Sequence, residues 1–323
     1  MRAALLKEYG DPVANIEVVD IAEPASPGRD EVLVQVEYAP VNPADLLLLM
    51  GHYAVKPTLP SVAGNEGVGT VLSVGPGAVG VKAGDRVALP LSSFTWRERM
   101  VIPAKDLVAL PMAADLQQLA MVAVNPGTAS LLLTEFKELH AGDWIVQNAA
   151  NSGVGRSVIA YARERGLRTV NIVRRPELIE DLEVAGADIV LLNGDGIAER
   201  TRAAVGGAAI GFGIDGLCGP ETGVIASILA PQGTLVTYGA MTHAPLSISP
   251  ADVIYKGLKM TGLFIGNPEH ARKFPTAIQQ SANLIAAGKL RVPVAAVYPL
   301  SSVKEAVAHA RRGGKVLLDI SGH

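Results

Sequence analysis

The stretch that decides the fold is Gln147-Asn-Ala-Ala-Asn-Ser-Gly-Val-Gly-Arg156. It lies between an expected strand over 143–148 and an expected helix over 154–165. A helix that begins in this way presents N–H groups and a partial positive charge, which suit a pyrophosphate. Gly153 and Gly155 carry no side chain where backbone and ligand would approach each other. The spacing is not G-x-G-x-x-G, so the prediction depends on the strand–turn–helix frame, and an ordinary glycine-rich turn is the alternative.

Strands and helices alternate along the chain on the C-terminal side of this loop. Further strands are expected over 168–173, 188–192, 212–217, 233–238 and 259–265, with helices over 176–185, 197–205, 221–229 and 250–256 between them. Such alternation predicts a parallel sheet covered by helices on both faces. Together with 143–148 there are six strands, which match a complete doubly wound Rossmann sheet in an α/β protein.

The turn after the second expected strand carries Arg174 and Arg175. A protein that binds NAD usually has Asp or Glu about 20 residues after the glycines, where it bonds the ribose 2′-hydroxyl. Two guanidinium groups suit a 2′-phosphate instead. These residues predict NADPH as the cofactor, and a solvated charged turn before Pro176 is the alternative.

The regions on either side of the expected Rossmann domain differ from it. Residues 1–121 are predicted to be β-rich, with short strands within 32–38, 67–75 and 83–89 separated by Gly- and Pro-rich turns. Residues 122–266 are predicted to form the Rossmann domain. Residues 267–323 carry two expected helices and a final strand over 315–320, and we expect them to pack back on the first domain.

The composition excludes several classes of protein. Apolar residues make up 49% and charged residues 18%, which is typical of a globular chain. The net charge is -3 without a basic stripe, so nucleic acid is not an expected partner. The apolar runs fall far short of the ~20 residues that span a bilayer, and residues 1–10 contain no signal-peptide core. We therefore expect a cytoplasmic protein without a membrane partner.

Cys218 is the single cysteine of the chain. An intrachain disulfide is therefore impossible, and so is a Cys-rich zinc site, which usually takes ~4 ligands dominated by Cys and His. We interpret Cys218 as a small buried hydrophobic residue.

Several segments resemble the medium-chain dehydrogenase/reductase superfamily. They are Asn42-Pro-Ala-Asp45, Leu59-Pro60, Gly64-Asn-Glu-Gly67, Gly75-Pro-Gly77 and Ala83-Gly-Asp-Arg-Val87. The resemblance implies that residues 1–121, joined by 267–323, form a GroES-like catalytic domain. Zinc alcohol dehydrogenases of this superfamily carry His where this chain has Asn65, and their four-cysteine lobe has no counterpart here. The sequence therefore predicts no metal site, and simple alcohol oxidation loses its Lewis acid.

Within the zinc-free branch, the chain resembles the mitochondrial-type 2-enoyl thioester reductases. The matching segments are Phe94-Thr-Trp-Arg97, Val124-Asn-Pro-Gly-Thr-Ala129, the run from Asn148 to Arg174, and Thr237-Tyr-Gly-Ala-Met241. The resemblance implies a catalytic tyrosine a few residues after the Asn-Pro-x-Asp segment, where this chain has Tyr53. A tyrosine in a loop more often serves packing, so this role depends on the matching position.

The resemblance also implies further contacts to the cofactor. The residues expected to bind it, from the loop, the arginine pair and the resemblance together, are Asn125, Asn151, Ser152, Gly153, Val154, Gly155, Arg174, Arg175, Tyr238, Gly239, Met241, Leu263, Phe264, Ile265 and Lys315. Tyr238 and Met241 could equally be packing residues at the end of a strand. The family's basic cluster after the second strand differs here in detail, because Pro176 takes one of its places.

The expected reaction is hydride transfer from NADPH to the β-carbon of an α,β-unsaturated thioester. Tyr53 would donate a hydrogen bond to the thioester oxygen or protonate the α-carbon. The alternatives are a quinone or enone reductase of the same branch and a non-catalytic NADPH-binding protein. The expected strand over 259–265 could pair with its copy at a sheet edge, which predicts a homodimer.

Overall fold

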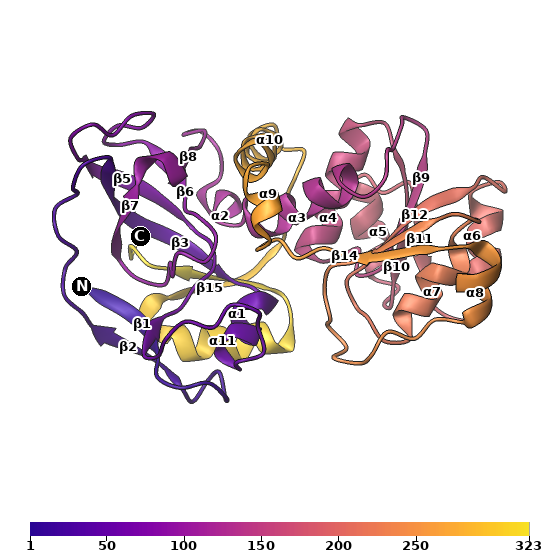
Figure 1. Cartoon of the computed structure of the whole chain (residues 1–323), viewed down its shortest axis with the longest axis horizontal. Helices are drawn as coiled ribbons and strands as arrows, with labels where there is room; N and C mark the ends of the chain where they lie inside the picture. Colours follow the sequence, from indigo (N-terminus) through magenta and orange to yellow (C-terminus); the bar gives the residue numbers. More distant parts are fainter. Residues whose placement is uncertain (323) are drawn as a thin grey trace. The chain divides into compact units, whose positions relative to one another are not determined.

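The computed structural model describes residues 1–322, which fall into two compact units. The first unit contains Met1–Val124 and the C-terminal residues from Lys273 onward, and the second is Asn125–Arg272 (Figure 1). No helix among the described residues is long and apolar enough to cross a membrane.

The second unit is built on a parallel sheet of six strands. The strands are β9 (Trp144–Gln147), β10 (Arg168–Val173), β11 (Ile189–Leu192), β12 (Ile210–Asp215), β13 (Thr234–Thr237) and β14 (Lys259–Gly262), in the order β11-β10-β9-β12-β13-β14. Every pairing in this sheet is parallel, so the carboxyl ends of all six strands meet at one edge. This is the doubly wound order of a Rossmann sheet, which confirms the predicted fold class.

Helices cover this sheet through two separate apolar clusters. The helices of this unit are α3 (Val124–Thr134), α4 (Gly153–Glu164), α5 (Leu178–Val184), α6 (Ile197–Ala204), α7 (Glu221–Ile228), α8 (Pro250–Lys256) and α9 (Pro268–Ala271), and α4 to α7 contribute to the two clusters. Val170 and Ile172 of β10 pack in one cluster with side chains of α6 and α7. Val173 packs in the other cluster with side chains of α4 and α5. Because neighbouring side chains of a strand point to opposite faces, helices cover both faces of the sheet.

The first unit contains two sheets. Its strands are β1 (Arg2–Leu6), β2 (Ile16–Asp20), β3 (Glu31–Val41), β4 (Ser61–Val62), β5 (Val68–Val74), β6 (Arg86–Ala88), β7 (Arg99–Pro103), β8 (Val108–Ala109), β15 (Val294–Pro299) and β16 (Lys315–Asp319). The larger sheet has the order β15-β16-β3-β5-β6-β8, with β7 also paired to β3, and the smaller has the order β2-β1-β4.

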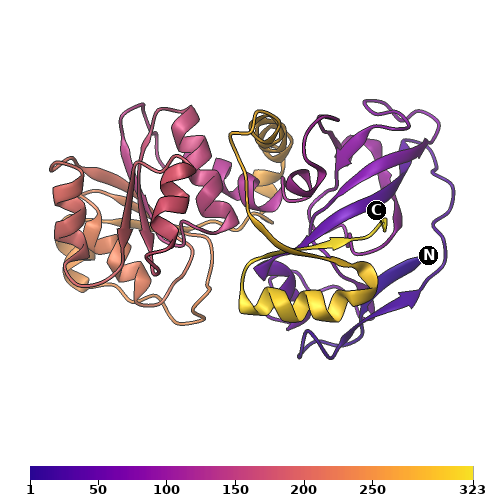
Figure 2. The ribbon, with the colours of Figure 1, turned by 180° about the vertical axis from the view of Figure 1, so that it is seen from behind.

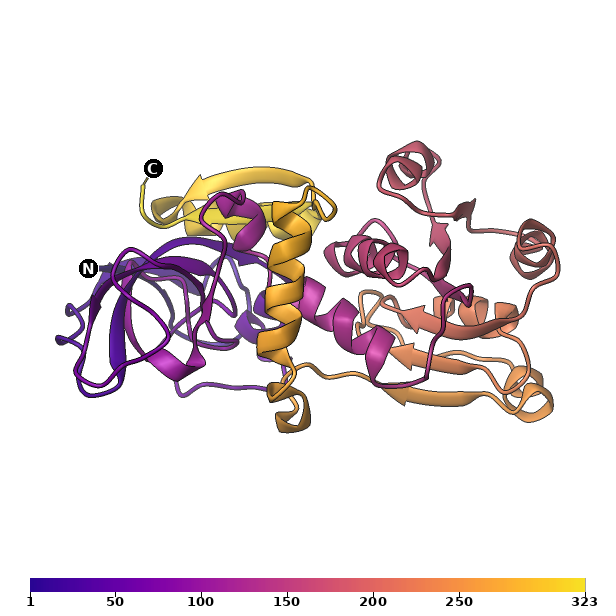
Figure 3. The same ribbon diagram turned by 90° about the horizontal axis from the view of Figure 1, so that it is seen from above.

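The C-terminal strand completes the larger sheet. β16 lies antiparallel to β3, with Val316 opposite Val41 and Leu318 opposite Ala39. Figure 2 shows the yellow C-terminal strand beside the purple strands of this unit. The helices of this unit are α1 (Pro43–Leu49), α2 (Leu116–Leu119), α10 (Phe274–Ala286, seen from the side in Figure 3) and α11 (Val303–Arg312), with short 3-10 helices at Ala104–Asp106 and Leu300–Ser302. The last strand therefore lies beside a strand nearly 280 residues earlier in the chain.

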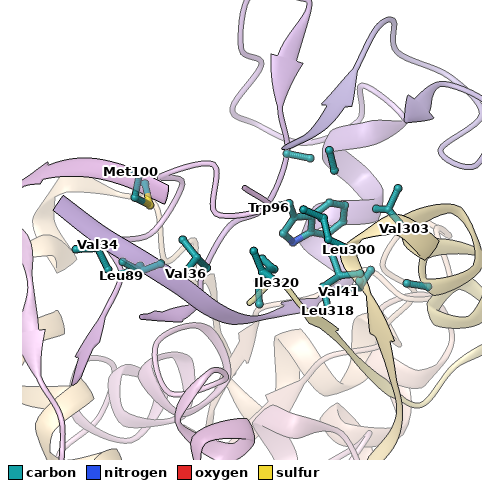
Figure 4. Packing of buried hydrophobic residues seen from close by; sticks show 14 of the residues in the cluster. Val34, Val36, Val41, Leu89, Trp96, Met100, Leu300, Val303, Leu318 and Ile320 are labelled. Atoms are coloured by element: carbon teal, nitrogen blue, oxygen red, sulfur yellow. The ribbon is translucent and has the colours of Figure 1, made fainter. Parts of the chain in front are cut away.

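A hydrophobic core fills the first unit around Trp96 (Figure 4). Trp96 is fully buried, and its indole N–H donates to the carbonyl of Pro40 at 3.4 Å. Truncating such a side chain typically costs ~3–5 kcal/mol. A Cβ at Gly64, where φ is +101°, would collide with Trp96 and Thr95. The core therefore determines the path of the Gly64–Gly67 segment, which leads into the candidate site.

Candidate active site

The glycine-rich loop leads directly from β9 into α4. Ser152 is the N-cap of this 12-residue helix, and its hydroxyl accepts a hydrogen bond from the N–H of Gly155 at 3.0 Å. Val154 is buried, whereas Asn151 is exposed. The first turn of α4 therefore lies at the carboxyl edge of the sheet, where a helix N-terminus suits an anion.

Both glycines of the loop pack closely against other atoms of the chain. A Cβ at Gly155 would lie 2.5 Å from the carbonyl oxygen of Ala150. A Cβ at Gly153 would lie 2.8 Å from the side chain of Asn125, which comes from the first turn of α3. Neighbouring atoms of the chain thus give a reason for these glycines that is independent of any ligand. The same contact places Asn125 beside the loop.

Two polar side chains at the end of β9 hold this loop in place. Gln147 donates through its amide to the carbonyl of Gly155 at 3.0 Å and to Oδ1 of Asn171 at 2.8 Å. Asn148 donates to Oδ1 of Asp215 at 2.7 Å and accepts from the N–H of Gly216 at 2.8 Å. Both residues are part of the loop motif quoted above, but sequence reasoning gave them no role, although polar side chains at the end of a buried strand are a signal for one.

Asp215 is fully buried at the end of β12 and has hydrogen-bond donors on both carboxylate oxygens. Besides the amide of Asn148, Oδ1 accepts the N–H groups of Leu217 at 3.0 Å and Cys218 at 3.1 Å. Oδ2 accepts the hydroxyl of Thr222 at 2.7 Å. Such donors compensate a buried carboxylate for its lost hydration, and here they join the ends of β9 and β12.

Tyr238, directly after β13, reaches the N-cap of α4. Its hydroxyl is hydrogen-bonded to Ser152, and its ring lies against Gly216, where a Cβ would be 2.5 Å from the Tyr238 oxygen. Burial raises the pKa of Tyr238 to about 12, and the charge of Asp215 adds to this shift. Tyr238 therefore stays protonated at neutral pH.

The residues after Tyr238 differ in exposure. The carbonyl of Gly239 accepts the thiol of Cys218 at 2.8 Å, and that cysteine is buried. The side chain of Met241 is 54% exposed.

Arg174 and Arg175 are exposed and follow directly on β10, at the same carboxyl edge as the loop. Arg175 lies 3.4 Å from a carboxylate oxygen of Glu177, and both side chains are exposed, so water and salt weaken this pair. Within residues 1–322, Arg174 has no carboxylate partner. Its guanidinium group is thus available for an anion.

The segment after β14 completes this edge. β14 ends at Gly262, three residues earlier than the expected strand over 259–265. Leu263 is buried, Ile265 is half-buried and Phe264 is 39% exposed. The carboxyl edge of the second unit therefore brings together all the predicted cofactor residues that belong to that unit.

Tyr53 belongs to the first unit, in the turn after α1. Gly51 adopts a φ of +75° there, and the N–H groups of His52 and Tyr53 both donate to the carbonyl of Leu47, at 2.8 and 3.2 Å. The half-buried ring packs against the core of the unit. Burial raises the pKa of Tyr53, and the charge of Asp45 raises it further. Tyr53 therefore carries its proton at neutral pH, which the catalytic role predicted for it requires.

A chain of polar contacts in the same unit joins three segments that are far apart in the sequence. The Lys315 ammonium group donates to Oδ1 of Asn42 at 2.6 Å, and the Asn42 amide donates to Oε1 of Glu66 at 2.7 Å. The other carboxylate oxygen of Glu66 accepts the N–H groups of Ala123 at 3.1 Å and Val124 at 2.7 Å. Lys315 was expected to contact the cofactor; within its own unit it bonds to Asn42.

Burial perturbs all three ionisable groups of this cluster. It raises the pKa of Asp45 to about 7, raises the pKa of Glu66 and lowers the pKa of Lys315. Asn42, Asp45 and Glu66 belong to motifs quoted above, but sequence reasoning gave them no role in a site. Groups with perturbed pKa values are often found at functional sites.

Asn65 serves a structural role next to this cluster. Its Oδ1 accepts the N–H of Ser92 at 2.9 Å and the Ser92 hydroxyl at 3.0 Å. In the part of the chain that the structure describes, no group of three or more His, Cys, Asp or Glu side chains is placed to hold a metal ion.

A dinucleotide-binding sheet joined to a β-rich unit with a tyrosine and buried ionisable groups defines a class of nucleotide-dependent oxidoreductases. Two family models match the chain: the alcohol dehydrogenase GroES-like domain over residues 28–112 and the zinc-binding dehydrogenase over residues 153–283. The chain belongs to the medium-chain dehydrogenase/reductase superfamily, and the predicted resemblance is confirmed.

Individual relatives agree with this assignment. The chain is 35% identical over 317 residues to the mitochondrial enoyl-[acyl-carrier-protein] reductase of Rattus norvegicus, covering 95% of this chain and 84% of the relative. A protein of Bacillus thuringiensis assigned as an NADPH:quinone reductase has a TM-score of 0.89 at 26% identity, covering 99% and 98% of the two chains. Etr1p of Candida tropicalis, whose structure holds NADP and crotonyl-CoA, has a TM-score of 0.89 at 24% identity and 99% coverage of both chains, and supports the fold.

Proposed function

We propose that this protein is an NADPH-dependent reductase of the C=C bond of 2-enoyl thioesters. The observation that carries the proposal is the 35% identity, over 95% of the chain, to an enoyl-[acyl-carrier-protein] reductase. The protonated hydroxyl of Tyr53 adds support, because the reaction needs a donor beside the thioester. CoA and acyl-carrier-protein thioesters are both compatible with these residues.

The residues at the carboxyl edge of the second unit fit NADPH. The start of α4 suits a pyrophosphate, and the Ser152 hydroxyl accepts from the N–H of Gly155 beside that helix start. Arg174 and Arg175 would bind the 2′-phosphate, where charge-assisted hydrogen bonds are strong. NADPH, when bound, supplies the hydride, and the protein residues bind and orient it.

Tyr53 would stabilise the charge that develops on the thioester oxygen. Removing one well-placed donor of this kind typically costs ~3–4 kcal/mol of transition-state stabilisation. The same hydroxyl can alternatively deliver a proton to the α-carbon. The experiment that tests the proposal is a steady-state assay of crotonyl-CoA reduction with NADPH and with NADH; no turnover with either would contradict it.

A quinone or enone reductase is the second candidate function. The likeness to the Bacillus thuringiensis protein, at 26% identity over 99% of this chain, favours it. Comparing kcat/KM for crotonyl-CoA and for a small quinone separates the two functions. A protein that binds NADPH but turns over neither substrate class would be the non-catalytic alternative.

We propose that the reaction needs no metal. The position where zinc relatives carry His is Asn65, whose amide oxygen is already used by Ser92, and the chain has one cysteine. Activity that survives dialysis against a chelator, together with elemental analysis of the protein, tests this. The cytoplasmic location stays a prediction, and the rat relative is named mitochondrial.

We also propose a homodimer formed through β14. This strand is at the end of the sheet and pairs with β13 on one side, and all four of its residues are exposed. Met260 of this strand is 39% exposed, and Ile254 and Tyr255 of the preceding helix α8 are 69% and 85% exposed. An unpaired edge with apolar residues is a typical pairing surface. Light scattering of the protein and of Ile254→Asp tests it: a monomeric wild-type protein would contradict the proposal.

A further inference from the structure

Asp45 is a buried carboxyl group that has no role in the reaction proposed above. It is 2% exposed and is the N3 residue of α1, where its Oδ2 accepts the N–H of Asn42 at 2.7 Å. Its other oxygen, Oδ1, is buried and makes no hydrogen bond of normal geometry. A buried carboxylate with a single good donor is poorly compensated for its lost hydration.

The charges around Asp45 do not balance. Its charged neighbours are Glu66 and Lys315, and its titratable neighbour is Tyr53. One ammonium group thus faces two buried carboxyl groups. Glu66 accepts three hydrogen bonds, from the Asn42 amide and from the N–H groups of Ala123 and Val124. Because Glu66 is the better compensated acid, Asp45 is the one that keeps a proton.

We propose that Asp45 is a positioning residue that acts in its protonated form to keep Tyr53 an effective donor, so that ionisation of Asp45 slows the reaction. The inference deepens the proposed function and rests on it. A negative charge near Tyr53 strengthens the hold of the tyrosine on its proton and opposes negative charge developing on a substrate oxygen. A neutral carboxyl group does neither.

The directions of the pKa shifts of Asp45 and Tyr53 agree with this proposal. Burial raises the pKa of Asp45 to about 7 and the charge of Glu66 adds to this, while the N–H groups of Asn42 and Asn65 and the charge of Lys315 lower it. The charge of Asp45 in turn raises the pKa of Tyr53. Asp45 is therefore neutral below about pH 7 and charged above it, so kcat is expected to fall as the pH rises through that value.

The test compares pH profiles of crotonyl-CoA reduction for the wild-type protein and Asp45→Asn. The amide preserves the helix cap, because its oxygen can accept the N–H of Asn42, but it cannot ionise. We expect the wild-type kcat to fall about tenfold per pH unit at most above about pH 7. The variant should lose this decrease and keep its affinity for NADPH. A decrease that persists unchanged in Asp45→Asn would overturn the proposal.

Two further variants make the comparison decisive. Asp106→Asn changes an exposed aspartate of the same unit and should keep the wild-type profile. Asp45→Ser also removes the titrating group while leaving a capping oxygen, so it should behave as Asp45→Asn does, and it replaces that variant if Asp45→Asn does not fold.

Infrared spectroscopy of the ligand-free protein tests the proton on Asp45 without any substrate. The difference between wild-type protein and Asp45→Asn should contain the carbonyl band of a protonated carboxyl group at about pH 6, and this band should vanish as the pH rises through about 7. Absence of the band would overturn the role of Asp45 alone. If the band titrates but the wild-type protein reduces no crotonyl-CoA at any pH, the proposed function fails instead, and the role of Asp45 toward Tyr53 fails with it.

Discussion

Two buried aspartates, one in each unit, have contrasting surroundings. Asp215 in the second unit is fully buried and accepts hydrogen bonds from Asn148, Thr222 and two backbone N–H groups. Asp45 in the first unit is almost as buried but accepts one hydrogen bond of normal geometry, from Asn42, beside a weaker contact with the N–H of Asn65. Neutral donors thus satisfy the carboxylate that shapes the nucleotide loop, whereas the one near Tyr53 is left short of donors. The difference supports a structural role for Asp215 at the nucleotide loop. It also supports the proposed role of Asp45 in proton donation by Tyr53.

The largest expected effect comes from removing the well-satisfied carboxylate. Asp215→Ala leaves at least three buried donors without an acceptor, each costing ~1–3 kcal/mol, so we expect the free energy of unfolding to fall by about 4 kcal/mol or more. Asp45→Ala removes one cap and should cost about 1 kcal/mol. Urea denaturation of both variants measures this, and equal losses of stability would remove the contrast between the two sites.

Tyr53→Phe tests the chemical side of the comparison. Loss of one donor to a developing oxyanion should lower kcat for crotonyl-CoA by about 100- to 1,000-fold while NADPH affinity stays unchanged. Tyr298→Phe is a matched control, because Tyr298 is also half-buried in the first unit and its hydroxyl bonds to His309 at 3.1 Å. An unaltered rate in Tyr53→Phe would exclude Tyr53 from the mechanism.

Arg174→Gln tests the nucleotide edge of the second unit. A charge-assisted hydrogen bond contributes ~1.5–3 kcal/mol, so the Kd for NADPH should rise by about 10- to 100-fold and the Kd for NADH should not change. Arg168→Gln is the control, since Arg168 lies at the other end of β10 and pairs with Asp188 at 2.7 Å. Equal weakening of NADPH and NADH would show that Arg174 does not bind the 2′-phosphate.

The smallest expected effect is that of Tyr238→Phe. The variant loses the hydrogen bond to Ser152, worth about 1 kcal/mol, so the Kd for NADPH should rise by about fivefold with kcat little changed. Isothermal titration calorimetry measures this. A large loss of kcat would instead give Tyr238 a part in the chemistry.

Local patterns in the sequence predicted the second unit well. The expected strand over 168–173 is β10, and the expected helix over 250–256 is α8, which Ser249 caps. Arg174 and Arg175 follow β10 at the edge where the loop also lies. These features depend on residues within one strand, one helical turn or one tight turn, and such short-range rules act before the chain is packed.

Local sequence patterns predicted the first unit less completely. No helix was predicted over 43–49 from the sequence, although Asn42 and Asp45 form a capping box that begins α1 there. β15 was not expected, because Val294–Pro299 has half-buried and exposed positions without a strong apolar alternation, and its pairing with β16 defines it.

The sequence by itself determined the alternation of strands and helices, the glycine-rich loop and the basic pair that follows β10. The tertiary structure alone decided that Asp45, Glu66 and Lys315 share one buried cluster. Lys315 reaches Asn42 because β16 pairs with β3 and sets Val316 opposite Val41. Strands, helices and tight turns depend on residues that are close in the sequence, so a pattern in the sequence predicts them. The protonation of a buried carboxyl group depends on charges and hydrogen-bond donors that only long-range packing brings to it.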